Sequence, residues 1–274
     1  MADRAHRRLP AAAALGALVW LFAGAGPMAA WTPATQQTIA WEAAHLAPPD
    51  LERQILRRKA AFMAGVLAPF DETDPGRHRK NADGSGRLDK ALLEAVAEAV
   101  AAIHALRPFD EIVQRLGTVS HFMADANNPL ATSADDPEEG RYFVDFLRYA
   151  ESAEPRFPLV FYGVRPRLER PADVSSLLGE TLRRGRALSS LVGLEYRNLD
   201  FASGIGRFDD RSTAFGVASV AFSHAVTDVA LLLRYIWLEG GGADERNDLP
   251  ASGTRLLLLP RAVQLAPASS AGGH

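Results

Sequence analysis

Apolar residues at helical spacing run through most of this sequence, and they limit the folds open to it. The first such segment lies between Leu51 and Val66. Further segments with the same spacing are 88–106, 110–126, 138–151, 172–196 and 212–237. Only Phe157 to Val164 favours a strand. We therefore expect an all-α fold with a single domain over residues 31–238, followed by a poorly ordered C-terminal tail over residues 239–274.

The N-terminal residues 1–30 differ from the rest of the chain. Three arginines precede the apolar run "AAAALGALVWLFAGAG", and small residues follow it up to Trp31. This order is typical of a secretory signal peptide. An uncleaved anchor is the alternative, but the run is shorter than the roughly 20 apolar residues of a spanning helix. We expect cleavage before Trp31, an exported protein (periplasmic or secreted), and no integral membrane segment after processing.

The charge and the cysteine content narrow the function further. Without residues 1–30, which include three arginines and one aspartate, the chain keeps 27 basic and 32 acidic residues and a net charge of −5. This balance argues against a protein that binds duplex DNA. Cysteine is absent, so packing or a metal must stabilise the exported chain. Any metal would be bound by histidine, carboxylate and main-chain groups.

The segment "VSHFMADANNPL" carries the clearest chemical signal. His121 and Asp125 are four residues apart, which places their side chains about 5–6 Å apart on one helix face. Two donors on adjacent turns can bind one metal ion. In the alternative interpretation, Asp125 only orients a buried imidazole through a hydrogen bond. Asn127 to Pro129 then ends the helix.

Further donor residues precede this segment. Asp71 and His78 bracket a polar loop that can turn both side chains inward. His45 follows Trp31 by fourteen residues. Cleavage before Trp31 would free an α-amine, which titrates near ~7.7–8.0 and readily exchanges its proton for a metal. Together with its own carbonyl oxygen, this amine is a candidate chelating pair.

From Trp31 to about Ala150, the sequence resembles the zinc-dependent phospholipases C of bacteria and the related single-strand nucleases. In that family, zinc is bound by an N-terminal Trp, a nearby His, an Asp and a His of the next loop region, and a helical HxxxD that precedes an Asn-x-Pro turn. The resemblance implies about two zinc ions and the following ligands: Trp31, His45, Asp71, His78, His121 and Asp125.

The sequence departs from the family at the remaining zinc site. Ala131 stands where the family has a histidine, and Arg141 replaces the histidine of a second pair that ends in Asp145. Asp145 alone cannot hold a third ion. Arg141 is then either a substrate-binding residue that grips a phosphate in place of the lost ion, or an ordinary surface arginine.

Other candidate donors have simpler explanations. His224 and Asp228 form a second HxxxD, which either adds a compensating metal site or is a buried histidine bonded to Asp228. His104 has no partner at a meaningful spacing and is interpreted as a helix-surface residue. The loop 81–89 resembles the first half of an EF-hand, but Leu92 replaces the glutamate that calcium requires.

The resemblance implies zinc-dependent hydrolysis of a phosphoester, with a phospholipid head group or single-stranded nucleic acid as substrate. Asp71 would serve both as zinc ligand and as proton acceptor. The alternative is a non-catalytic exported helical protein that keeps zinc to stabilise a cysteine-free fold. Both interpretations require metal binding, and the losses at Ala131 and Arg141 are what separate them.

Overall fold

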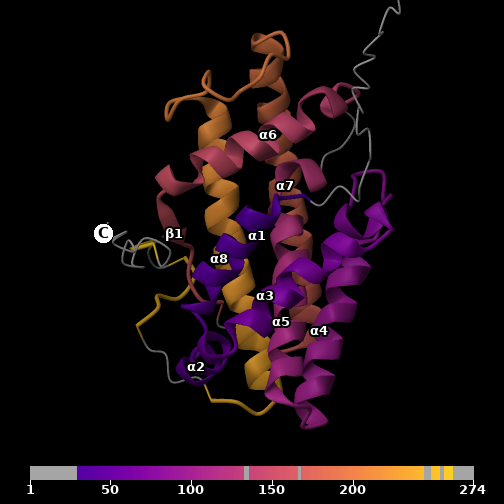
Figure 1. The fold of residues 1–274 in the computed structure, drawn as a ribbon, viewed down its shortest axis with the longest axis vertical. Helices are drawn as coiled ribbons and strands as arrows, with labels where there is room; N and C mark the ends of the chain where they lie inside the picture. The colour runs from indigo at the N-terminus through magenta and orange to yellow at the C-terminus, as the bar shows by residue number, and fades with distance from the viewer. Residues whose placement is uncertain (1–29, 133–135, 166–167, 244–247, 254–255, 262–274) are drawn as a thin grey trace, which may run out of the picture.

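The computed structural model describes residues 30–132, 136–165, 168–243, 248–253 and 256–261. These residues are mostly helical, as the sequence predicts. The helices are α1 (Pro33–Ala44), α2 (Pro49–Arg57), α3 (Lys59–Leu67), α4 (Leu88–His104), α5 (Phe109–Asn127), α6 (Glu139–Ala153), α7 (Pro171–Asn198) and α8 (Thr213–Glu239). The long helices α4, α5, α7 and α8 run along the longest axis of the molecule, and α6 crosses α7 and α8 near one end (Figure 1).

Two helix boundaries differ from the sequence-based expectation. The first predicted segment is divided at Arg58, whose φ of −118° and ψ of 34° separate α2 from α3. The break lets the Arg58 guanidinium reach Asp110 at the start of α5, 2.9 Å away. Sequence reasoning assigned no helix to residues 33–44. The N-terminal signals of α1 are nevertheless present, because Thr32 caps the helix and Pro33 occupies its first turn.

Helix α8 lies at the centre of the core. It is long and apolar enough to cross a membrane by length and composition alone, which the sequence analysis did not anticipate. In the structure, however, 83% of its most apolar window is buried inside the protein. Helices α1, α5 and α7 and the strand β1 (Leu159–Phe161) pack against it. We therefore interpret α8 as the central core helix.

Helices α3 and α5 approach each other closely, and this contact positions the histidine of α5. A Cβ at Gly65 of α3 would lie 1.8 Å from the carbonyl oxygen of Gln114, and a Cβ at Gly117 of α5 would lie 2.2 Å from that of Phe62. Only glycine fits at either position. The close contact brings the carbonyl of Val66 within hydrogen-bonding distance of the His121 ring.

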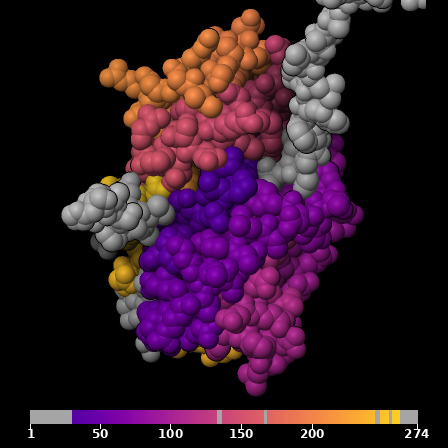
Figure 2. Space-filling model, in the orientation of Figure 1, coloured from indigo at the N-terminus to yellow at the C-terminus, as the bar shows by residue number. Residues whose placement is uncertain are grey.

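Part of the predicted loose tail is packed against the core. β1 pairs antiparallel with β2 (Leu257–Leu259), so the apolar "LLLLP" stretch completes a two-stranded sheet. After β2, the Arg261 side chain is buried, and its Nε lies 2.8 Å from a carboxylate oxygen of Glu42 on α1. Figure 2 shows the N-terminal helices, in indigo, forming much of the visible face below α6. Within the tail that the sequence analysis describes as poorly ordered, residues 256–261 thus include a paired strand and a buried ion pair.

Candidate metal centre

The second half of α5 lies entirely inside the protein. Every residue from Val119 to Asn127 is buried, and the side chains of His121 and Asp125 are 0% exposed. The helix ends where Asn128 adopts an extended conformation and its side chain accepts a hydrogen bond from the Leu130 N–H. The Asn-Asn-Pro sequence thus ends α5 as predicted. The last residue of the helix, Asn127, is itself a buried polar side chain.

The described residues bring three metal-ligating side chains together, one from a loop and two from α5. His78 ends a short 3-10 helix (Pro75–His78), and its Nδ1 lies 2.7 Å from Oδ2 of Asp125. Nε2 of His121 lies 3.2 Å from the same oxygen and 3.2 Å from the His78 Nδ1. Ligand atoms around a tetrahedral zinc are about 3.3 Å apart, given zinc–ligand bonds of about 2.0–2.1 Å. The three atoms therefore form one slightly contracted face of such a tetrahedron.

The surroundings of His121 orient it as a ligand. Its Nδ1 lies 2.8 Å from the carbonyl oxygen of Val66, so this nitrogen carries a proton and donates a hydrogen bond to the backbone. Nε2 then faces Asp125 and His78, and it is the nitrogen that a metal ion would take in exchange for its proton. Metal-bound histidines usually donate their second ring nitrogen in this way, which fixes both the tautomer and the ring orientation. Phe70 packs edge-on against the ring, with 4.9 Å between the ring centroids.

The His78 ring is fully buried. Burial opposes its protonation, but the hydrogen bond and the negative charge of Asp125 outweigh this effect and raise the pKa of His78. Its Nε2 is buried without a well-formed hydrogen bond. The ring nitrogen that faces Asp125 and His121 is Nδ1, so an ion bound there would leave the ring proton on Nε2.

Asp125 joins the cluster to the N-terminal segment. Burial alone would raise the pKa of Asp125, but the two imidazoles outweigh it and lower the pKa, so the carboxylate is charged. Its Oδ2 faces the histidines, while its Oδ1 accepts hydrogen bonds from Gln36 Nε2 at 2.6 Å and from the Ala30 N–H at 3.3 Å. Sequence reasoning missed Gln36. A single amide in the polar segment 35–38 carries no spacing signal that would have identified it.

Trp31 is buried beside the cluster, although its main chain is not among the three assembled ligands. Its indole Nε1 donates to the carbonyl of Ala124 at 2.9 Å. The preceding residue, Ala30, is bound from both sides: its N–H by Asp125 and its carbonyl by the Asn128 amide. The residue that the predicted cleavage would remove therefore lies directly against Asp125.

The structure does not place His45 and Asp71 in this group. Nδ1 of His45 lies 2.8 Å from the carbonyl oxygen of Trp41, one turn earlier on α1. Asp71 is exposed at the end of the 3-10 helix Ala68–Asp71, although its neighbour Phe70 contacts His121. Of the six predicted zinc ligands, His78, His121 and Asp125 are assembled.

The positions of the degenerate zinc site have other partners. Arg141 is exposed, lies 2.8 Å from a carboxylate oxygen of Glu138 and stacks over the Phe201 ring at 3.7 Å. Asp145 accepts hydrogen bonds from the Ser203 hydroxyl and the Gly204 N–H. Within the described parts of the chain, neither residue belongs to a second group of metal ligands.

The second HxxxD is divided between two environments. Asp228 is buried and accepts hydrogen bonds from Thr181, at 2.9 Å, and from Arg184, at 2.5 Å. The His224 ring stacks on Tyr162, with 3.7 Å between the centroids. Burial first, and then the charges of Arg184 and Arg165, lower the pKa of His224 to about 3. The sequence suggested either an additional metal site or a histidine hydrogen-bonded to Asp228. In the structure Asp228 instead pairs with Thr181 and Arg184, and His224 stacks on Tyr162.

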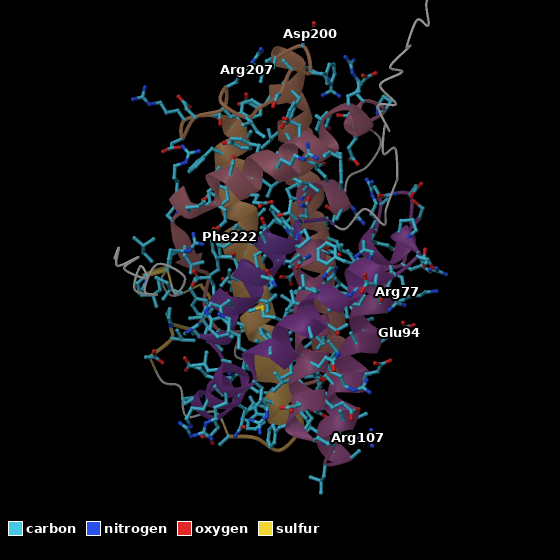
Figure 3. The ribbon with its side chains drawn as sticks, viewed as in Figure 1. Arg77, Glu94, Arg107, Asp200, Arg207 and Phe222 are labelled. Atoms are coloured by element: carbon cyan, nitrogen blue, oxygen red, sulfur yellow. The ribbon has the colours of Figure 1, made fainter. Side chains whose placement is uncertain are left out.

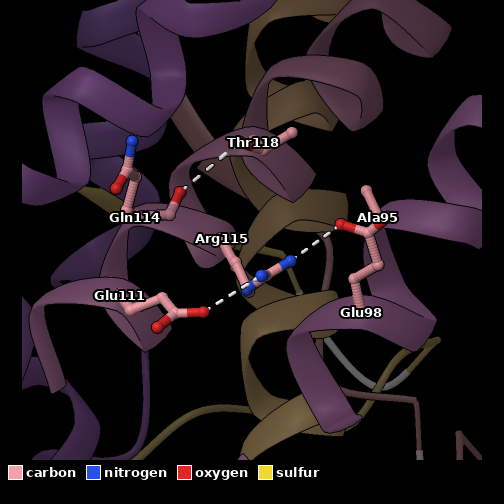
Figure 4. A pocket seen from close by; sticks show the side chains of 6 residues that line it. All are labelled: Ala95, Glu98, Glu111, Gln114, Arg115 and Thr118. Carbon is pink, nitrogen blue, oxygen red and sulfur yellow. Dashed lines mark hydrogen bonds and ion pairs between the residues drawn. The ribbon is translucent and has the colours of Figure 1, made fainter. Parts of the chain in front are cut away.

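Two surface hollows lie away from the cluster. One, of about 250 Å³, lies between α4 and α5, where Arg115 bridges Glu98 and Glu111 (Figure 4). The other, of about 520 Å³, is a largely apolar groove formed by α4, α7 and α8, with His104 at one end. His104 Nε2 lies 3.0 Å from the carbonyl oxygen of Glu239. The buried cluster does not line either hollow.

No protein-family model matches the sequence, and a comparison with curated proteins finds no match.

Proposed function

We propose that this protein is an exported zinc-dependent phosphoester hydrolase whose metal centre is built on His78, His121 and Asp125. The observation that carries the proposal is the buried group itself, with three ligand atoms 2.7–3.2 Å apart. The resemblance to zinc phospholipases C and single-strand nucleases supplies the reaction class. A phospholipid head group and single-stranded nucleic acid remain the two candidate substrates.

The number of ligands favours catalysis. Three protein ligands and one open position are the usual pattern of catalytic zinc sites, whereas structural sites use four protein ligands. A bound zinc ion would supply an activated water and positive charge for the phosphoryl group. The protein residues would orient the ion: Val66 through His121, and Gln36 through Asp125.

Processing is part of the proposal. Oδ1 of Asp125 accepts hydrogen bonds from the Ala30 N–H and from Gln36, so cleavage before Trp31 would remove the first of these donors and make the Trp31 nitrogen an α-amine. Asp125 could then bridge to the second of the two expected zinc ions, with Trp31 as its other ligand. His45 could keep the contact of its Nδ1 with the Trp41 carbonyl, and its Nε2 would then have to reach the ion.

Complete burial favours a second candidate, a non-catalytic zinc-stabilised protein. The three side chains of the cluster are 0% exposed. Asp71, the predicted proton acceptor, points to solvent, and Arg141 is engaged by Glu138 and Phe201. A site from which solvent and substrate are excluded suits a metal that stabilises the fold.

A matched pair of proteins separates the two candidates. One starts at Trp31, released from a cleavable fusion, and the other retains Ala30 in front of it. We expect both to bind zinc, and only the first to hydrolyse a generic phosphodiester, with activity lost to a chelator and restored by zinc. If both proteins bind zinc and neither hydrolyses phosphoesters, the structural role is correct. If neither binds zinc, both candidates fail.

A further inference from the structure

The turn between α4 and α5 holds a leucine in an unfavourable backbone conformation. Leu106 has a φ of +51°. Its N–H donates to the carbonyl of Ile103, and the next N–H, of Arg107, donates to that of Ala102. This pattern ends a helix with a residue in the left-handed region, a position that glycine usually occupies because a Cβ is strained there. For the turn itself, leucine is therefore a poor choice.

The packing of Leu106 does not compensate for this strain. Its side chain is 89% exposed, the largest value among the exposed large apolar residues described. Phe201 offers a contrast, because it also has a positive φ, of 57°, but packs its ring between Arg141 and Tyr142. The folded protein thus gains nothing visible from the Leu106 side chain. A single exposed leucine is ordinary, but one that is held at a conformational cost raises the question of a role outside the fold.

Neighbouring residues extend this feature into a surface. Phe109 and Leu56 are each 37% exposed. Arg58 connects the two segments, because its guanidinium lies 5.2 Å from the Phe109 ring centroid and 2.9 Å from Asp110. We define the Leu106 surface as the exposed residues around this contact, namely Leu106 and Phe109 on one side and Leu56, Arg57 and Lys59, the neighbours of Arg58 in the chain, on the other. Figure 3 places the adjacent Arg107 at the extreme end of the molecule, opposite Asp200.

The charges of this surface favour an anionic partner. Arg58 and Arg107 are engaged by Asp110 and Glu111. Arg57 and Lys59 are exposed and have no acidic partner among the described residues, and the Lys59 ammonium lies over the Trp41 ring at 4.0 Å. Projecting apolar side chains flanked by uncommitted cations are the combination that binds an anionic lipid surface.

We propose that the Leu106 surface docks the protein reversibly on anionic lipid bilayers, with Leu106 and Phe109 entering the interface and with Arg57 and Lys59 facing the lipid phosphates. The proposal is independent of the metal centre. Insertion of one leucine should strengthen binding about tenfold. Each of the two cations should contribute about fivefold at low salt.

Sedimentation of the purified protein with phosphatidylcholine vesicles, with and without phosphatidylserine, tests this proposal. Leu106→Gly relieves the backbone strain, so it should leave the unfolding temperature unchanged or raise it while weakening vesicle binding about tenfold. The double variant Arg57→Ser with Lys59→Ser should lose only the preference for phosphatidylserine. Leu194→Ala is the matched control, because Leu194 is 54% exposed on α7 near the opposite end.

Three results would overturn the proposal. The first is vesicle binding by Leu106→Gly equal to that of the wild type. The second is a lower unfolding temperature in this variant, which would show that Leu106 serves the fold. The third is a wild-type dimer in sedimentation velocity that Leu106→Gly dissociates, which would assign the surface to a second copy of the chain. Zinc content should be the same in all these variants, so failure here leaves the metal centre untouched.

Discussion

The two HxxxD pairs of this protein have the same spacing in the sequence, but different residues contact them in the structure. On α5, His121 and Asp125 lie on one buried face, 3.2 Å apart, and His78 joins them from a distant loop. On α8, Asp228 pairs with Arg184 instead, and the histidine of that pair stacks on an aromatic ring. The helical spacing places donors on adjacent turns, but it does not decide what they bind.

Two features of the surroundings make the difference. The α5 pair receives a second imidazole, and among the described residues no arginine pairs with its carboxylate, so Oδ2 of Asp125 is available to an ion. Arg184 already neutralises Asp228, and the cations of Arg184 and Arg165 repel any further positive charge from His224. A metal centre therefore requires a third donor from elsewhere in the chain, together with the absence of a competing cation.

Removing the carboxylate from each pair should give the largest difference. Asp125→Ala leaves two buried imidazoles without their counter-charge, so we expect a loss of about 3–5 kcal/mol in unfolding free energy and of all bound zinc. Asp228→Ala also leaves a partly buried arginine unpaired and should cost about 1–3 kcal/mol, with zinc unchanged. Urea unfolding and metal analysis measure both quantities. If Asp125→Ala and Asp228→Ala bound equal amounts of zinc, the claim that only the α5 pair binds the metal would be wrong.

Removing the histidines should give a smaller difference of the same kind. His121→Ala loses the hydrogen bond to Val66 and leaves a cavity beside Phe70, which together cost about 2–4 kcal/mol. Bound zinc should fall with it. His104→Ala, on the surface of α4, should change neither zinc content nor stability. If the His121→Ala variant bound as much zinc as the wild type, the assignment of His121 on α5 as a zinc ligand would be wrong.

The α8 histidine should be visible in the pH dependence of stability instead. The pKa of His224 is about 3 in the folded protein and near the ordinary 6.5 when unfolded, so the unfolded state takes up the proton first. The free energy of unfolding therefore does not depend on His224 above about pH 6.5. As the pH falls from there toward 3, the free energy of unfolding decreases by up to about 1.4 kcal/mol per pH unit on account of this histidine. His224→Phe, which keeps a ring on Tyr162, should flatten this slope. Urea unfolding of the wild type and of His224→Phe at about pH 7 and about pH 4.5 would test this. An equal change in unfolding free energy between the two pH values in both proteins would contradict it.

Arg141 should give the smallest effect. It is exposed and pairs with Glu138 on the helix surface, so Arg141→Ala should cost less than about 0.5 kcal/mol and leave zinc unchanged. With Arg141 so placed, we also expect little change in phosphodiester hydrolysis. A strong fall in turnover without loss of zinc would instead support the phosphate-binding role that the sequence suggests.

The sequence predicts most of the helices and all three residues of the assembled cluster, although only half of the six predicted ligands belong to that cluster. Long amphipathic segments such as α4 and α5 reveal themselves by their periodicity, and the Asn-Asn-Pro stop fixes the end of α5. The i, i+4 spacing is local, so it is visible in the sequence. The role of Gln36 and the burial of Arg261 depend on contacts between distant segments, which leave no local pattern.

Anomalous scattering from a crystal of the zinc-loaded protein, measured on both sides of the zinc absorption edge, tests the metal centre most directly. The account predicts a peak about 2.0–2.2 Å from Nδ1 of His78, Nε2 of His121 and Oδ2 of Asp125. It also predicts no peak between His224 and Asp228. The absence of a peak at the α5 cluster, or a peak beside Asp228 instead, would contradict it.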